Sequence, residues 1–339
     1  MTLSVLLLGL ALTACDAPST SAAAPEAATT VVAADLPDPI YEAYDFFVVA
    51  GQSNAKGRGD SPLAPEVPPG AAYEVTPSGV VSAMADPVGG ANTGSAWPAF
   101  ANAYSAATGR GVVIVGQAVG GASQVALAGD TGSQTWDVSR DDNLYTRSDR
   151  KARRALRAAE DALPGVRAVG WLWIQGGTDA RRIEEGVVKS VQYESALHDL
   201  ARRVDQDWGV PVYLFVSGTD ARGDFPGAVT VREIQNAADA LDEVVVVYRD
   251  AFTFPARGWM QPDNVHWSQP GLNEAGTEAG AVAGADRLTR LVDSDDPTTP
   301  NYSEAVVVFP NPSARSPQVN AGCPFRYEVV DRLGRRVAE

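Results

Sequence analysis

Between residues 45 and 292, short apolar runs alternate with segments whose apolar positions recur at helical spacing. The apolar runs are 46–50, 112–115, 169–174, 212–216 and 244–248. Strands that are apolar throughout are typical of a parallel sheet covered on both faces. The helical patterns lie between and after them, at 97–108, 147–163, 187–208, 229–241 and 271–292. This alternation predicts an α/β fold: a three-layer α/β/α sandwich with a five-stranded parallel sheet.

Composition divides the chain into five segments. Residues 1–14 contain an apolar run too short to span a bilayer, which predicts a signal peptide. Residues 15–42 are mostly Ala, Pro, Ser and Thr, and predict a disordered tether. The globular domain is expected at 43–292, followed by a linker at 293–303 that is rich in Asp, Pro and Thr. Segment 304–339 predicts a few β-strands.

The net charge and the histidine count of the chain argue against several classes of partner. The chain has 339 residues and a net charge of -15. Binding to nucleic acid requires a positive field, so this charge argues against it and also disfavours adsorption to anionic lipid. With only two histidines, the sequence offers no histidine-rich ligand set, and we expect neither a metal nor a cofactor.

Three distant segments are predicted to meet at one edge of the sheet. Ser53, the pair Gly120-Gly121 and Gln175 each follow a predicted strand. In parallel α/β sheets, ligands bind beyond the carboxyl ends of the strands. This convergence predicts a site at that edge, with the Ser53 hydroxyl in it.

The histidines supply one plausible base. His198 lies within a predicted helix, whereas His266 follows Asp263 by three residues on a predicted loop. A carboxylate at that spacing can hold the imidazole Nδ1–H and leave Nε2 free to take the proton of Ser53. These residues alone leave open an alternative, in which Asp263 caps the final helix and His266 is a packing residue.

Four blocks in the same order resemble those of the SGNH hydrolases, in the sialate O-acetylesterase-like branch that includes carbohydrate esterase family six. The blocks are Gly51-Gln52-Ser53-Asn54, then 118–123 with a later Trp136, then 172–179, and Asp263-Asn264-Val265-His266-Trp267. The resemblance covers about residues 45 to 292. It implies a flavodoxin-like sheet and an enzyme that removes O-acetyl groups from a carbohydrate of the acetylxylan or sialate type.

The resemblance also implies a role for each matching residue. Ser53 is the expected nucleophile, His266 the base and then the acid, and Asp263 the orienting carboxylate. The expected oxyanion hole combines the Ser53 amide, a backbone amide from Gly120 or Gly121, and the Gln175 side chain. The residues expected to contact the substrate are Gln52, Asn54, Trp136 and Trp267.

The sequence departs from the family pattern at Gly177, where relatives usually have Glu, and at Ala55, where they often have Met. In some relatives that Glu assists the histidine, so here Asp263 alone would orient His266. Two other functions therefore stay open: a catalytically silent carbohydrate-binding surface protein on the same fold, and a general SGNH lipase or thioesterase.

Both ends of the chain predict a location outside the cytoplasm. Leu12-Thr13-Ala14-Cys15 resembles the lipoprotein box, so a lipidated Cys15 would tether the protein to a membrane; a plain signal peptide is the alternative. Residues 309–313 and 329–335 resemble a truncated sorting domain of the type nine secretion system. These two signals predict different final locations, lipoprotein-anchored or secreted to the cell surface.

Overall fold

The computed structural model describes residues 36–292, except 77, 130–133 and 221–222, and the backbone of short strands at 31–32, 329–330 and 336–338. The predicted signal peptide, Cys15 and the linker lie outside the described residues. Of the segment 304–339, only β9 (Val329–Val330) and β10 (Arg336–Ala338) are described, and they pair antiparallel. The sorting-type domain stays a prediction.

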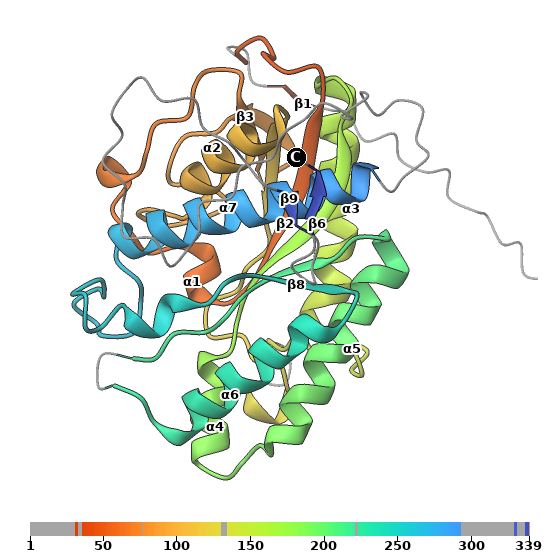
Figure 1. Ribbon diagram of the computed structural model, residues 1–339. Coiled ribbons are helices and arrows are strands. Elements are labelled where there is room, and N and C mark those ends of the chain that lie inside the picture. Colours follow the sequence, from red (N-terminus) through yellow and green to blue (C-terminus); the bar gives the residue numbers. More distant parts are fainter. Residues whose placement is uncertain are drawn as a thin grey trace, which may run out of the picture.

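A sheet of eight strands forms the centre of the domain (Figure 1). Its order is β1-β4-β3-β5-β2-β6-β7-β8. All its pairings are parallel except the one between β3 and β4. The strands are β1 (Val31–Val32), β2 (Tyr44–Gly51), β3 (Ala72–Val75), β4 (Val80–Ala83), β5 (Gly111–Gly116), β6 (Arg167–Ile174), β7 (Val212–Phe215) and β8 (Val244–Tyr248).

The five predicted strands are confirmed as β2, β5, β6, β7 and β8. Numbered among themselves in chain order, they run 2-1-3-4-5 across the sheet, which is the flavodoxin-like order. The predicted total of five is wrong, because β1, β3 and β4 extend the sheet beyond β5. Strands β3 and β4 have only four residues each and β4 is partly exposed, so neither produces the apolar run that marks a buried strand.

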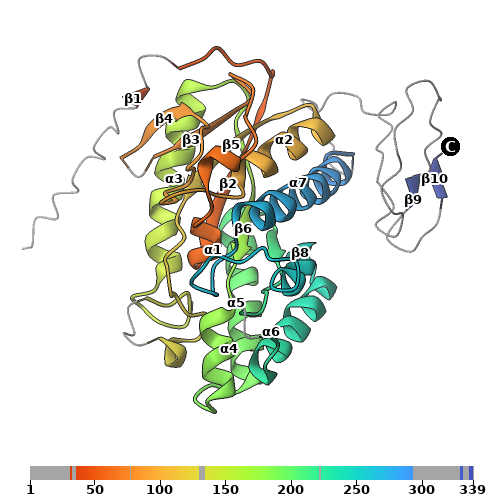
Figure 2. The same cartoon turned by 90° about the vertical axis from the view of Figure 1, so that its left-hand side faces the viewer.

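Helices cover both faces of the sheet, as predicted. Phe46 and Val48 of β2 pack into a core with α3, α5 and α6, whereas Phe47 and Val49 pack into a second core with α2 and α7. Figure 2 shows the sheet between α3 on one side and α2 and α7 on the other. The α-helices are α1 (Ser53–Lys56), α2 (Trp97–Thr108), α3 (Leu144–Ala162), α4 (Gly177–Glu184), α5 (Ser190–Trp208), α6 (Pro226–Ala237) and α7 (Gln269–Val292). Short 3₁₀ helices are η1 (Ser61–Leu63), η2 (Ala126–Ala128), η3 (Ala238–Ala240) and η4 (Asp250–Thr253).

Glycines let α7 lie directly on α2. A Cβ at Gly276 would stand 2.2 Å from the Ala96 carbonyl oxygen, and one at Gly280 would stand 2.4 Å from that of Phe100. Neither position therefore accepts a side chain unless the helices separate. This contact fixes the start of α7, and with it the loop that precedes the helix.

The end of the predicted tether belongs to the domain. The Tyr73 hydroxyl donates to the Pro37 carbonyl at 2.7 Å, and the Ile40 amide donates to the Tyr44 hydroxyl at 3.1 Å. Pro37 and Ile40, which lie within the predicted tether, therefore contact the domain. In the described part of the chain, no helix combines the length and the apolar character needed to span a bilayer.

Candidate active site

Ser53 stands at the turn that ends β2. Gly51 has φ 114°, and a Cβ there would lie 2.2 Å from the Ile174 carbonyl oxygen, so only glycine fits at this position. Two residues later Ser53 opens α1 and is 8% exposed. The turn lies at the carboxyl end of β2, between β5 and β6, where the strand order reverses. Crevices at such reversal points are where parallel sheets bind ligands.

Asp263 and His266 form a hydrogen-bonded pair on the loop before α7. The Asp263 Oδ2 atom lies 2.5 Å from Nδ1 of His266. Its Oδ1 atom accepts from the amides of Val265 at 2.9 Å and His266 at 3.0 Å. One carboxylate therefore fixes both the ring and the backbone that carries it, and Nε2 of the ring remains available for proton transfer.

The contacts of Asp263 keep it charged. Partial burial raises the pKa of its carboxyl, but the hydrogen bonds from the His266 ring and from the amides of His266 and Val265 outweigh burial and lower the pKa to about 2. A charged Asp263 stabilises a positive charge that develops on the imidazole when the ring accepts a proton.

Asn54 joins the serine turn to the histidine loop. Its Oδ1 atom accepts from the Trp267 amide at 3.1 Å. Within the loop, the Gln261 amide donates to the His266 carbonyl at 2.7 Å, and Asn264 adopts a left-handed φ of 61°. The predicted meeting of these two segments, about two hundred residues apart in the sequence, is therefore present in the structure.

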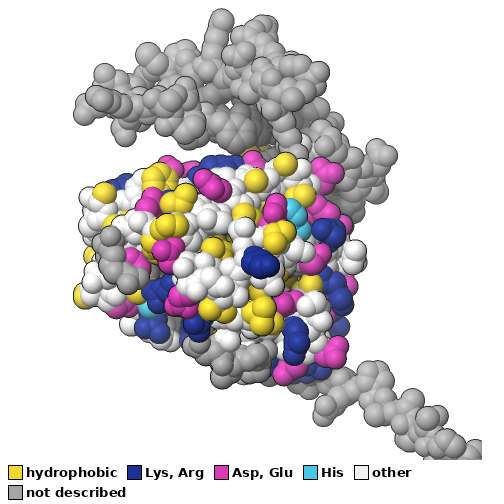
Figure 3. All heavy atoms as spheres, turned by 90° about the horizontal axis from the view of Figure 1, so that it is seen from below, with side chains coloured by type: hydrophobic (Ala, Val, Ile, Leu, Met, Phe, Trp, Pro, Cys, Tyr) yellow, Lys and Arg dark blue, Asp and Glu magenta, His cyan; other side chains and the backbone are white. Residues whose placement is uncertain are grey.

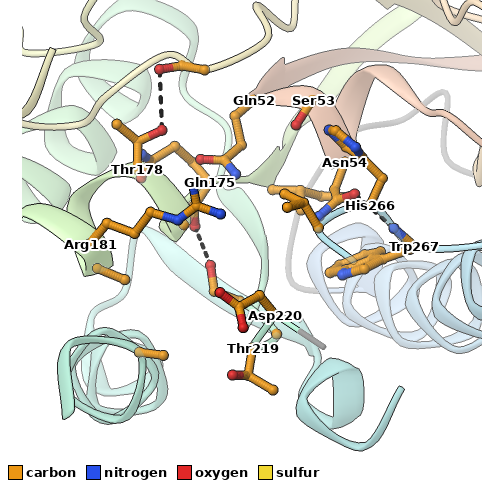
Figure 4. A pocket seen from close by; sticks show the side chains of 18 of the residues that line it. Gln52, Ser53, Asn54, Gln175, Thr178, Arg181, Thr219, Asp220, His266 and Trp267 are labelled. Carbon is orange, nitrogen blue, oxygen red and sulfur yellow. Dashed lines mark hydrogen bonds between the residues drawn. The ribbon is translucent and has the colours of Figure 1, made fainter. Parts of the chain in front are cut away.

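Ser53 and His266 line the same pocket, which has a volume of about 370 Å³. Figure 4 shows the His266 ring beside the Ser53 side chain, at one end of this pocket. Among the hydrogen bonds of the described residues, none joins the two side chains; such contacts commonly tighten when a substrate binds. The arrangement brings a hydroxyl, an imidazole and an orienting carboxylate to one wall of a cavity.

The glycine loop, residues 117–125 after β5, runs along the other side of Ser53. Its first residues are attached to β2, because the Gln117 and Val119 amides donate to the carbonyls of Val49 and Gly51. A Cβ at Gly120 would lie 3.9 Å from Cβ of Ser53. Among the described residues, no group accepts a hydrogen bond from the amides of Gly120 and Gly121, so both amides remain free to bind an oxyanion.

Residues 43–282 match the family of carbohydrate esterases described as sialic acid-specific acetylesterases. The chain belongs to this family. It is a carbohydrate acetylesterase of the SGNH type.

Two solved structures share the fold of the acetylesterase. A protein from Arabidopsis thaliana has a TM-score of 0.52 at 19% identity, with 75% of this chain and 98% of that chain covered. NanS has a TM-score of 0.50 at 15% identity, with 75% and 99% covered. No protein with a curated description matches the chain.

The role predicted for the Gln175 side chain is corrected by its contacts. Both N–H groups of its amide are occupied, by the Ala122 carbonyl at 3.2 Å and by the Asp179 carboxylate. Its Oε1 atom accepts from the Tyr193 hydroxyl at 3.4 Å. The amide thus belongs to a buried polar network beneath the pocket and has no donor left for an oxyanion. A motif match does not reveal this orientation, because it depends on Asp179 one helical turn later.

Trp136 and Trp267 are core residues of the acetylesterase. Trp136 is fully buried; its Nε1 donates to the Gly51 carbonyl at 3.1 Å, and its ring packs edge-on against Trp173. It therefore supports the serine turn, and the prediction that it contacts the substrate is wrong. Trp267 contributes to the pocket lining, but it is 2% exposed and packs edge-on against Phe254. This leaves its ring no open face on which a sugar could stack.

Gln52 occupies the space beside Gly177. Both residues line the pocket, and a Cβ at Gly177 would lie 3.0 Å from Nε2 of Gln52. Its Oε1 atom accepts from the Gly176 amide at 3.4 Å. A glutamate at 177, as in relatives, would require this amide to move. The amide of Gln52 therefore occupies the space beside position 177.

The sequence analysis did not identify two arginines that line the pocket. Arg58 follows the serine block, and Arg181 lies one helical turn after Gly177 on α4. Among the described residues, no carboxylate forms an ion pair with either guanidinium. Figure 4 shows Arg181 extending into the pocket opposite His266. In the sequence, the only sign of Arg181 was its position four residues after Gly177. That spacing is informative only when α4 is known to begin at the pocket.

In the same described part, no three His, Cys, Asp or Glu side chains gather into a group that could hold a metal ion.

Proposed function

We propose that this acetylesterase removes O-acetyl groups from a sugar through an acyl-enzyme on Ser53, with His266 as base and Asp263 as the orienting carboxylate. The observation that carries the proposal is the Asp263–His266 hydrogen bond, on the wall of the pocket that Ser53 also lines. The family membership of the chain supports the acetyl ester as the bond that is cleaved.

Acylation follows from this geometry. The Ser53 hydroxyl attacks the acetyl carbonyl carbon while Nε2 of His266 takes its proton. The carbonyl oxygen becomes an oxyanion, which the amides of Ser53, Gly120 and Gly121 stabilise. When the intermediate collapses, His266 donates the proton to the sugar oxygen, and the sugar leaves as an alcohol.

Deacylation repeats these steps with water. His266 takes a proton from a water molecule, which attacks the carbonyl carbon of acetyl-Ser53. The same amides bind the second oxyanion. Collapse returns the proton to Ser53 Oγ and releases acetate. Each of these roles is filled by a residue that lines the pocket or by a residue that orients a lining residue.

The two arginines favour a substrate with a carboxylate. Arg58 and Arg181 supply two positive charges to a pocket whose one acidic lining residue is Asp220. Guanidinium groups bind carboxylates through paired hydrogen bonds. An O-acetylated sialic acid carries such a carboxylate, whereas an acetylated xylan backbone is neutral. We therefore place the sialate type ahead of the acetylxylan type.

Replacing the nucleophile tests the proposal. Ser53→Ala should lower kcat/KM for nitrophenyl acetate and for an O-acetylated sialic acid by at least about 10³-fold, because no other group takes over the attack. Ser195→Ala, an exposed serine on α5, is the matched control and should keep full activity. Turnover by Ser53→Ala within tenfold of the wild type would overturn the assignment.

We further propose that the protein acts outside the cytoplasm, on the sequence Leu12-Thr13-Ala14-Cys15 alone. Cells expressing the full chain should incorporate labelled palmitate into the wild type but not into Cys15→Ser. Equal labelling of both would exclude Cys15 as the lipidation site. Protein recovered from the cytoplasm with its N-terminus intact would contradict the location itself.

A further inference from the structure

We propose that Asp179 is a positioning residue of the acetylesterase: from the first turn of α4, its carboxylate holds the glycine loop so that the Gly120 and Gly121 amides face the acetyl carbonyl. This rests on the proposed function, in which those amides form the oxyanion hole. Asp179 does not itself line the pocket, so its effect on the reaction passes through the residues that it holds.

Both carboxylate oxygens of Asp179 accept from the backbone of the loop. Oδ2 accepts from the Gln124 amide at 2.8 Å, and Oδ1 accepts from the Val125 amide at 2.9 Å. Asp179 is 0% exposed, so no water competes for either bond. One side chain thus satisfies two consecutive amides at the far end of the loop, whose other end is attached to β2 through Gln117 and Val119.

The neighbours of Asp179 hold the same loop. The Thr178 hydroxyl donates to the Gly121 carbonyl at 3.2 Å, and the Gln175 amide donates both to the Ala122 carbonyl and to Asp179. Every side-chain contact that the segment 175–179 makes with the loop therefore lies within five loop residues, at Gly121 to Val125. Thr178 thereby orients the Gly121–Ala122 peptide unit. The Ala122 amide in turn donates to the Val119 carbonyl at 3.2 Å, which belongs to the peptide unit of the Gly120 amide.

The surroundings of Asp179 show that keeping this buried carboxylate charged costs free energy. Burial raises its pKa to about 6, although the hydrogen bonds from Gln124, Val125 and Gln175 lower it. Among the described residues, no cation forms an ion pair with it. The titratable group that faces it is the buried Tyr193 of α5, whose own pKa is raised by burial first and by the charge of Asp179 second. Buried, unpaired charges of this kind cluster at functional sites.

An asparagine has nearly the same shape but cannot replace both acceptors. Its amide offers one oxygen, and its NH₂ group would face the N–H of Gln124 or Val125. Protonation of Asp179 has a similar effect, because one oxygen then becomes a donor. The inference therefore predicts that the loop loosens in Asp179→Asn at every pH, and in the wild type only as pH falls through about 6.

Steady-state kinetics of Asp179→Asn in the full-length protein test the inference. For nitrophenyl acetate near pH 8, kcat should fall about 10- to 100-fold, as expected for a misplaced oxyanion donor, while KM stays within about threefold. The acid limb of kcat/KM should be less steep in the variant, because protonation of Asp179 no longer contributes to it. Asp199→Asn, the same change on the exposed side of α5, is the matched control and should behave as wild type.

Further measurements separate positioning from loss of fold. Melting curves give the folded fraction, and a kcat that falls only in proportion to that fraction overturns the inference, as does a kcat within twofold of wild type. If Asp179→Asn does not fold, Thr178→Val takes its place: it removes the bond to Gly121 without changing the buried charge, and kcat should fall about threefold or more.

Hydrogen exchange tests this inference independently of the proposed function. Should the wild type show no turnover that depends on Ser53, the proposed function fails, yet exchange of the amides of residues 120–125 still reports on the loop. Faster exchange there in Asp179→Asn than in Asp199→Asn supports the positioning role. Equal protection in the two variants overturns it, whatever the activity.

Discussion

At the scale of single residues, Asp263 is the carboxylate that holds the His266 ring. The loop gives this carboxylate three hydrogen-bond donors, and its pKa of about 2 keeps it ionised. Gly177 offers no second carboxylate near the ring. The free-energy contribution of Asp263 to folding is fully present above its usual pKa near 4 and is lost only as pH falls toward 2. Loss of activity between pH 7 and 4 therefore comes from other groups.

Removing this single carboxylate should be severe. Asp263→Asn should lower kcat/KM for nitrophenyl acetate roughly 10²- to 10⁴-fold, because the imidazole loses both its fixed tautomer and the charge that stabilises its protonated form. Asp60→Asn changes an exposed aspartate outside the pocket lining and is the matched control. Activity of Asp263→Asn within threefold of this control would show that another group orients His266.

Arg181 should discriminate between charged and neutral substrates. Arg181→Gln should raise KM for an O-acetylated sialic acid about tenfold or more and leave nitrophenyl acetate within twofold, because a charged hydrogen bond contributes about 1.5–3 kcal/mol. Arg182→Gln, next along α4 and paired with Glu185, is the control and should change neither value. An equal change for both substrates would contradict a carboxylate partner.

The sequence identified the side chains that meet at the pocket wall but not the direction in which their neighbours point. Ser53, Asp263 and His266 were predictable because a strand end and a short-range Asp–His spacing constrain them locally. Gln175 and Trp136 were assigned incorrectly, since their orientation depends on contacts with Asp179 and Gly51 that motif spacing does not encode.

At the scale of elements, one face of α7 determines how the histidine loop is supported. Gly276 and Gly280 bring α7 against α2, and the loop with Asp263 and His266 leads directly into α7. The sequence predicted this helix from its apolar spacing. It did not predict the close contact, because glycine carries no hydrophobic signal.

A methyl group on this face should weaken the domain. Gly280→Ala puts a Cβ within 2.4 Å of the Phe100 carbonyl oxygen unless the helices move. Overpacking of this kind costs about 1–3 kcal/mol, which exceeds the gain of about 1 kcal/mol in helix propensity. Denaturant unfolding should show a net loss of stability, while Thr277→Ala on the exposed face changes it by less than about 0.5 kcal/mol. A more stable Gly280→Ala would refute the close contact.

Strands were predictable where burial is complete and not where it is partial. The five central strands have the apolar runs expected for strands covered on both faces. The hairpin of β3 and β4 lies toward the edge, and its short strands mix apolar and polar residues. Its pairing is decided by the neighbouring β5, a tertiary contact that no local pattern reveals.

At the scale of the whole molecule, a net charge of -15 surrounds a pocket that contains two arginines. Figure 3 shows acidic and basic side chains interspersed over the face seen from below, so the negative charge is not gathered there into one patch. The proposed attraction of an anionic sugar by these arginines is therefore local, because such a field falls off within about 10 Å at 0.1 M salt.

The buried charge of Asp179 should appear in the stability of the whole domain. Its pKa is about 6 in the fold, above the model value of 3.8, so the folded state binds its proton more tightly and stability falls as pH rises between these values. The stability of Asp179→Asn relative to wild type should increase over this range by up to roughly 3 kcal/mol. Chemical unfolding at several pH values measures the difference, and parallel curves would contradict a raised pKa.

The most direct test of the account is to trap the acetylated enzyme. Wild type mixed with excess acetyl ester and quenched in acid within one turnover should yield a peptide containing Ser53 that is heavier by one acetyl group. The same peptide from Ser53→Ala should stay unmodified. Rapid turnover with no acetyl group on Ser53, or with the acetyl group on another residue, would contradict the central claim.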